Sequence, residues 1–127
     1  MNGEMSRVLV CGGRHYRDFK FVFRTLNKQH KHSPIGRIIV GGCSGADQFA
    51  ADWAHAAQIP CEKYMADWAI GPEAGPIRNQ RMLDEGEPGL VIAFPGGRGT
   101  ADMVRRARAA GVAVKEIDDG TSPWWNA

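Results

Sequence analysis

The sequence lacks the features that would place it in a membrane or on a secretory route. Its 127 residues contain no window of about 18 apolar residues, which excludes a membrane-spanning helix. The first residues lack a basic segment followed by an apolar core, so no signal peptide is expected. The three cysteines, Cys11, Cys43 and Cys61, are odd in number, far apart and without metal-ligand spacing. They favour a reducing compartment, so we expect a cytoplasmic protein with no bound metal.

A strong excess of one charge is also absent. The 16 Lys and Arg residues against 14 Asp and Glu residues give a net charge of +2, which is too small to indicate a nucleic-acid partner by itself. The chain has no low-complexity segment and no repeat of domain scale. At this length we expect a single domain over residues 7–117, between a flexible tail at 1–6 and a C-terminal tail at 118–127.

Short apolar runs alternate with helical patterns along the chain. The runs predict strands at residues 7–11, 37–40, 61–65, 90–94 and 112–114. Apolar residues at helical spacing predict helices at about 18–29, 46–58, 77–83 and 100–110. This alternation predicts an α/β fold, a Rossmann-like three-layer sandwich in which helices cover both faces of a mostly parallel sheet of about five strands.

Three of the predicted strands end in a pair of glycines. Gly12-Gly13 follows the first strand, Gly41-Gly42 follows the second, and Gly96-Gly97 follows the fourth. In an open parallel sheet these strand ends lie along one edge, where ligands bind. Glycines let the backbone approach an anion closely, although glycine turns also close loops for purely structural reasons. Their recurrence favours a phosphate site at this edge.

The stretch from Phe94 to Thr100 carries this signal in its strongest form. A buried strand, a glycine turn and a helix start follow one another, and the first N–H groups of a helix attract anions. Thr100 is expected either to cap the helix or to give its hydroxyl to a phosphate. The stretch is neither a P-loop, since no Lys follows the last glycine, nor a dinucleotide fingerprint, since Asp102 replaces the third glycine. The predicted phosphate donors are the N–H groups of Gly97, Arg98, Gly99 and Thr100.

Other polar and aromatic residues fall at the same predicted edge. Asp47 sits off the apolar stripe of its helix, and either stabilises the helix dipole or accepts bonds from ribose hydroxyls. Trp68, in a long loop rich in Gly and Pro, either packs as an anchor or stacks on a base, as Tyr16 would. The predicted ligand-binding set is Gly12, Gly13, Arg14, Gly42, Ser44, Gly45, Asp47, Trp68, Arg78, Asn79, Gly96, Gly97, Arg98, Gly99 and Thr100.

Three segments together resemble the YspA-like group of the SLOG superfamily. They are Gly41-Gly42-x-x-Gly45-Ala46-Asp47, Gly75-Pro76-x-Arg78-Asn79-x-x-Met82 and Ala93-Phe94-Pro95-Gly96-Gly97-x-Gly99-Thr100. The resemblance spans roughly residues 7–115. It implies a Rossmann-like domain that binds a nucleotide or a nucleotide-derived ligand. Because related domains form dimers, it also implies a homodimer or a higher homo-oligomer.

The same superfamily includes the LOG enzymes, phosphoribohydrolases that cut the base from cytokinin riboside monophosphates. Their phosphate-binding Pro-Gly-Gly-x-Gly-Thr motif matches residues 95–100, and their helix-borne Arg, ahead of a Met, matches Arg78 and Met82. LOG enzymes continue with one residue and two Glu, the second of which is catalytic. This chain has Ala101, Asp102 and Met103 there. The resemblance therefore implies ligand binding more strongly than turnover, and leaves Arg78 and Asp102 as candidate catalytic residues.

Three functions follow from these patterns. The first is a sensor or binding module for a nucleotide-derived ligand, with no cofactor of its own. The second is a nucleoside monophosphate phosphoribohydrolase, in which Asp102 or Asp47 would stabilise a cation-like sugar. The third is single-stranded nucleic-acid binding, supported only by the basic cluster Arg105, Arg106 and Arg108, which is otherwise typical of a solvated helix face.

Overall fold

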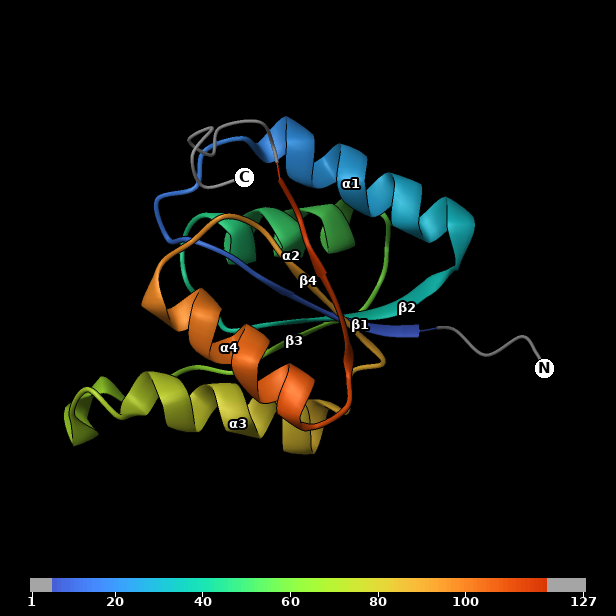
Figure 1. Cartoon of the computed structure of the whole chain (residues 1–127). Coiled ribbons are helices and arrows are strands. Elements are labelled where there is room, and N and C mark those ends of the chain that lie inside the picture. Colours follow the sequence, from blue (N-terminus) through green and yellow to red (C-terminus); the bar gives the residue numbers. More distant parts are fainter. Residues whose placement is uncertain (1–5, 119–127) are drawn as a thin grey trace.

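The computed structural model describes residues 6–118, in which strands and helices alternate along the chain (Figure 1). The strands are β1 (Ser6–Cys11), β2 (Ile35–Val40), β3 (Cys61–Lys63), β4 (Leu90–Ala93) and β5 (Ala113–Glu116). The helices are α1 (Phe19–His32), α2 (Ala46–Ala56), α3 (Ala74–Gly86) and α4 (Arg98–Ala109), with a short 3-10 helix η1 (Trp68–Ile70). The predicted tails fall outside the described residues, except for Ser6, which begins β1, and Asp118. No helix within residues 6–118 has the length and hydropathy needed to cross a bilayer.

All five strands pair in parallel, in the order β3-β2-β1-β4-β5. The chain winds outward from β1 to β3, returns to place β4 on the other side of β1, and ends at β5. Helices α1 and α2 lie together on one face of the sheet, and α3 and α4 lie together on the other (Figure 1). The predicted Rossmann-like three-layer sandwich is therefore confirmed, and the strand order reverses between β1 and β4.

Successive side chains of the central strands enter two separate cores, because they point to opposite faces of the sheet. Val8 and Val10 of β1 join the core beneath α1 and α2, whereas Leu9 and Cys11 join the core beneath α3 and α4. Met103 is a buried member of the second core. Burial on both faces explains why the strands read as continuous apolar runs.

Two element boundaries differ from the predicted ones in ways that matter for the site. Helix α3 begins at Ala74, ahead of the predicted start at Ile77, because a proline is tolerated in the first turn of a helix, where its missing N–H is not needed. Helix α4 begins at Arg98, so its N-cap is Gly97. The expectation that Thr100 caps this helix is therefore wrong: the glycine turn closes earlier and leaves Thr100 inside the first turn.

The glycine turns that follow β1, β2 and β4 pack directly against one another. A Cβ on Gly96 would lie 2.7 Å from the backbone nitrogen of Gly13, and a Cβ on Gly45 would overlap the carbonyl oxygen of Gly13. The N–H of Gly13 donates to the carbonyl of Pro95 at 2.9 Å, and the N–H of Ala46 donates to the carbonyl of Gly13 at 3.3 Å. Backbone thus fills the space that side chains would occupy, and the ends of three strands meet at one point.

Gly45→Ala is expected to lower the free energy of unfolding by roughly 2–4 kcal/mol, because the overlap with Gly13 adds to the strain of a side chain at a φ of +76°. Urea-induced unfolding of the full chain measures this loss. Gly89→Ala is the matched control, since a Cβ there would meet no atom within 4 Å. Equal unfolding midpoints for the two variants would contradict the packing described for the turns.

Candidate functional site

A cleft of about 1180 Å³ opens beside the carboxyl ends of β1 and β4, where the strand order reverses. Its walls come from the turn after β1, the loop around η1, the start of α3 and the turn between β4 and α4. Ligands of open α/β sheets bind at such a switch point. The predicted site residues that line the cleft are Gly12, Gly13, Arg14, Asp47, Trp68, Arg78, Asn79, Gly96, Gly97, Arg98, Gly99, Thr100 and Asp102.

The other predicted ligand-binding residues, Gly42, Ser44 and Gly45, lie outside this lining. Both glycines have a φ of +76°, a conformation that side chains rarely adopt. The hydroxyl of Ser44 donates to the carbonyl of Arg14 at 3.0 Å and ties the turn after β2 to the turn after β1. These contacts give the three residues a structural part in the site, and direct ligand contact stays a prediction for them.

The side chains of the lining that the predicted set omits include Cys11, His15, Tyr16, Cys43, Met82 and Arg105. The two cysteines directly adjoin the glycine pairs, and that position alone is the signal that could have identified them. Arg105 lies one helical turn beyond Asp102, a spacing that allows an ion pair. From the sequence, Arg105 is assigned to a basic cluster and this pair is not identified. Within residues 6–118, no group of three or more His, Cys, Asp and Glu side chains is arranged to hold a metal ion.

The N-termini of α1 and α2 each carry an acidic side chain. The first N–H groups of a helix have no partner within the helix and must find one elsewhere. At α1, the carboxylate of Asp18 accepts a hydrogen bond from the N–H of Phe21 at 3.0 Å. At α2, the N–H of Ala46 donates to Gly13, and the first turn carries the carboxylate of Asp47. The acidic side chain at each of these ends disfavours an anion there.

The N-terminus of α4 combines an exposed glycine turn, N–H groups that are unpaired within the described part of the chain, and the absence of an acidic side chain in the first turn. Helix α3 starts after Glu73 and has Pro76, which lacks an N–H, in its first turn. Helix α4 has Gly97 as its N-cap, with no side-chain cap and no acidic residue in the first turn. The N–H groups of residues 97–100 find no partner among residues 6–118. A Cβ on Gly97 or Gly99 would meet no atom within 4 Å, so the backbone of this turn is open to the cleft.

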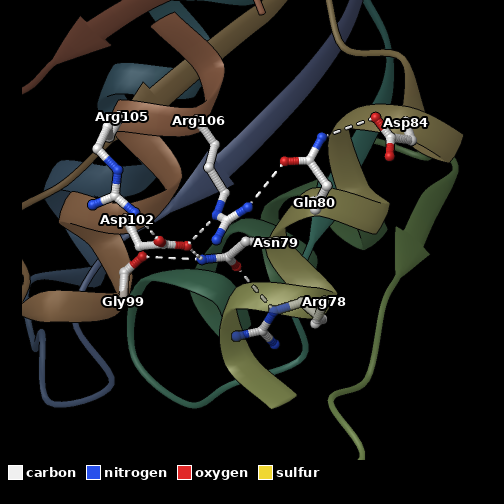
Figure 2. Close-up of polar contacts among 8 residues, drawn as sticks. All are labelled: Arg78, Asn79, Gln80, Asp84, Gly99, Asp102, Arg105 and Arg106. Atoms are coloured by element: carbon white, nitrogen blue, oxygen red, sulfur yellow. Dashed lines mark hydrogen bonds and ion pairs between the residues drawn. The ribbon is translucent and has the colours of Figure 1, made fainter. Parts of the chain in front are cut away.

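Asn79 of α3 holds this helix start in place (Figure 2). Its Nδ2 donates to the carbonyl of Gly99 at 3.2 Å and to Oδ2 of Asp102 at 3.0 Å. Its Oδ1 accepts from Nε of Arg78 at 3.1 Å. Asn79 is 4% exposed, and both polar atoms of its amide are engaged. Its geometry is that of a residue that positions the turn, and contact with a ligand stays a prediction.

Asp102 is the acidic centre of the same network (Figure 2). Its Oδ1 accepts from Nη2 of Arg105 at 2.5 Å, and its Oδ2 accepts from Nε of Arg106 at 2.8 Å. Although partial burial raises the pKa of Asp102, hydrogen bonds from Asn79 and Arg106 and the charges of both arginines hold that pKa below its usual range. The carboxylate is therefore ionised at neutral pH and is neutralised by two guanidinium groups, which makes it a poor proton donor.

Arg78 and Asp47 form a buried polar centre against the turn after β2. Nη1 of Arg78 donates to the carbonyl of Gly41 at 2.6 Å. Oδ2 of Asp47 accepts from the N–H groups of Gly41 and Cys43 at 3.2 and 3.3 Å. Burial raises the pKa of Asp47 to about 6, even though these hydrogen bonds and the Arg78 charge lower it. Asp47 is thus a buried carboxylate that titrates near neutral pH, a property common at functional sites.

Trp68 and two arginines give the cleft an aromatic surface and unpaired positive charge. Trp68 is 54% exposed, and the edge of its ring contacts Gly75, where a Cβ would lie 3.2 Å away. The ring is therefore anchored at one edge, as one of the two sequence interpretations expects, and stacking of a base on its exposed surface stays a prediction. Arg14 and Arg98 are exposed and form no ion pair within residues 6–118.

Comparison with known proteins identifies the family. Residues 6–71 match the YspA, cpYpsA-related SLOG family. The chain belongs to this family. A relative, the Gene 61 protein of Mycobacterium phage D29, is 36% identical over 124 residues, which cover 91% of this chain and 98% of that protein. SLOG membership implies binding of nucleotide-derived ligands in general. The family match contains the turns after β1 and β2, and ends before the turn that opens α4.

Asp47→Asn is expected to flatten the pH dependence of stability between pH 5 and 7. An acid whose pKa is higher in the folded state than in the unfolded state stabilises the protein at low pH, and this contribution is lost as the pH rises through the folded pKa. With a folded pKa of about 6 against an ordinary 3.8, the wild type should lose roughly 1 kcal/mol over this range through Asp47. Urea unfolding at several pH values measures the loss.

The exposed Asp52 of the same helix provides the control for this experiment. Asp52→Asn should leave the wild-type slope of stability against pH unchanged. A wild-type slope that persists in Asp47→Asn would contradict a raised pKa at Asp47.

Proposed function

We propose that this protein is a binding module for a nucleotide-derived ligand whose phosphate rests on the N-terminus of α4. The observation that carries the proposal is the start of α4, which is exposed in the cleft, has glycine as its N-cap and leaves the N–H groups of residues 97–100 without partners within residues 6–118. A phosphate there would accept hydrogen bonds from the N–H groups of residues 97–100 and from Arg98. Each charge-assisted bond is worth about 1.5–3 kcal/mol.

The remaining lining supports a nucleoside beside that phosphate. Trp68 offers a ring face on which a base can stack. Asp47 and Arg78 supply a buried acceptor and a buried donor at the wall of the same cleft, where ribose hydroxyls would bind. The family relationship gives the general class of ligand, and these side chains define our proposed orientation of it.

The core packing favours binding over LOG-like turnover. The resemblance aligns the catalytic Glu of LOG enzymes with Met103, which is 1% exposed and belongs to the core beneath α3 and α4. A carboxylate at this position would enter that core and not the cleft. Asp102, one residue earlier, already accepts bonds from two arginines and an asparagine.

Asp47 gives hydrolysis its best remaining support as a second candidate function. Its carboxylate lines the cleft and has a pKa of about 6, close to what a general acid or base needs at neutral pH. If the cleft hydrolyses an N-glycosidic bond, we propose Asp47 as the proton-transferring group and Asp102 as a positioning residue.

Nucleic-acid binding receives less support from the structure than from the sequence. Arg105 and Arg106 pair with Asp102, and Arg108 pairs with Glu116 at 2.7 Å, so the basic cluster is compensated within the chain. The homodimer or higher homo-oligomer implied by the resemblance stays a prediction. The cytoplasmic location also stays a prediction, consistent with three free cysteines.

Nucleotide binding should raise the melting temperature, which we would measure against AMP, GMP, NAD, ADP-ribose and a cytokinin riboside monophosphate. A ligand at 100 times its Kd stabilises the folded state by about 2.7 kcal/mol. Gly99→Ala should bind at least about tenfold more weakly, because its methyl group would occupy the open face of the turn. The variant should fold with equal or greater stability, since Ala favours a helix.

Gly89→Ala serves as the binding control and should retain wild-type affinity. If no ligand in the panel raises the melting temperature, the proposed phosphate site is wrong. Equal affinity in Gly99→Ala and the wild type would show that the phosphate does not bind at the start of α4.

Each mixture would also be analysed for free base and ribose phosphate. We expect a melting-temperature shift without products, as for a binding module. Products that disappear in Asp47→Asn and persist in Asp102→Asn would establish the second candidate function. Products that disappear only in Asp102→Asn would instead identify Asp102 as the catalytic residue, as the resemblance to LOG enzymes implies.

A further inference from the structure

The turn after β1 and the start of α4 lie side by side at the cleft. The N–H of Gly13 donates to the carbonyl of Pro95 at 2.9 Å, and a Cβ on Gly13 would lie 3.3 Å from the Cα of Gly96. The carbonyls of Gly13 and Arg14 are held by Ala46 and Ser44. The backbone of the first turn is therefore fixed against the second, and Arg14 and Arg98 occupy neighbouring sides of one cleft.

Arg14 and Arg98 belong to a minority of the arginines that the structure describes. Most arginine side chains of residues 6–118 have a carboxylate, carbonyl, amide or ring partner. Arg14, Arg17 and Arg98 have no such partner within these residues, and two of these three line the cleft. Over the whole lining, Arg14, Arg78, Arg98 and Arg105 face only two carboxylates, Asp47 and Asp102. A single phosphate bound at the start of α4 and at Arg98 would therefore leave the positive charge of Arg14 uncompensated.

Building on the proposed function, we propose that the cleft selects ligands with two linked phosphoryl groups over monophosphates, and that Arg14 is the selecting residue. One phosphoryl group would rest on the N–H groups of α4 with Arg98, and its neighbour would lie against the turn after β1 and pair with Arg14. Phosphoryl groups joined by a bridging oxygen are adjacent, as the two turns are. The cleft volume of about 1180 Å³ leaves room for a ligand larger than a mononucleotide.

Titration calorimetry at constant ionic strength, without added metal, tests this selection. The probe pairs are phosphate with pyrophosphate and AMP with ADP, so that the first pair is independent of the base. In the wild type, the diphosphate of each pair should bind about tenfold or more tightly than the monophosphate. In Arg14→Gln that ratio should fall towards one, mainly through weaker diphosphate binding. In Arg98→Gln both members of each pair should weaken together.

Arg17→Gln is the matched control, because Arg17 is exposed on the same turn and does not line the cleft. Its diphosphate preference should equal that of the wild type. A preference that grows again from ADP to ATP and falls equally in Arg17→Gln would reveal general electrostatic attraction, and would overturn the proposal. Equal binding of AMP and ADP, still weakened in Gly99→Ala, would overturn the selection and leave the proposed function standing. Binding of none of these probes would overturn the selection, and the proposed function would also fall if no ligand of the melting-temperature panel bound.

Discussion

The direct packing of backbone on backbone at the ends of β1, β2 and β4 is the constraint on which the rest of the structure depends. The bond from Gly13 to Pro95 joins the two halves of the sheet at the point where the strand order reverses. The N–H of Ala46, at the start of α2, donates to the carbonyl oxygen of the same Gly13. Because side chains would separate these turns, the glycines that shape the cleft are also those that hold the fold together. Gly97 and Gly99 are exceptions, since open space surrounds them.

A second constraint is the polar network that joins α3 to α4. Asn79 connects the buried guanidinium of Arg78 to the carbonyl of Gly99 and to Asp102. The network fixes the first turn of α4 before any ligand arrives, so little ordering remains to oppose binding. It also engages the carboxylate that lies nearest to that turn in sequence. The same contacts that would prepare the turn for the proposed anion thus make Asp102 less suited to proton transfer.

The sequence was sufficient for the architecture, because alternating strand and helix patterns and recurrent glycine pairs are local signals that agree with a parallel sheet. It was also sufficient to predict many of the residues that line the cleft, because the carboxyl ends of parallel strands share one edge of the sheet. It was not sufficient for the contacts made across that edge. Asp47 sits off the apolar stripe of its helix, yet it is 6% exposed because Arg78 and the turn after β2 enclose it. The roles of Asn79 and Arg105 likewise depend on partners that only the folded chain brings close.

The reversed strand order also bears on how the protein folds. The pairings of β1 with β2 and of β4 with β5 join segments separated by a single helix, whereas β1 and β4 pair Val8 with Leu90. Contacts between such distant segments carry a larger entropic cost of loop closure than local ones and slow the folding of a chain. The cleft lies on this seam, with Arg14 contributed by one half of the sheet and the α4 turn by the other. A molecule that bound across this seam would therefore stabilise the least local strand pairing of the domain, and would protect the sheet against opening as well as the loops it touched.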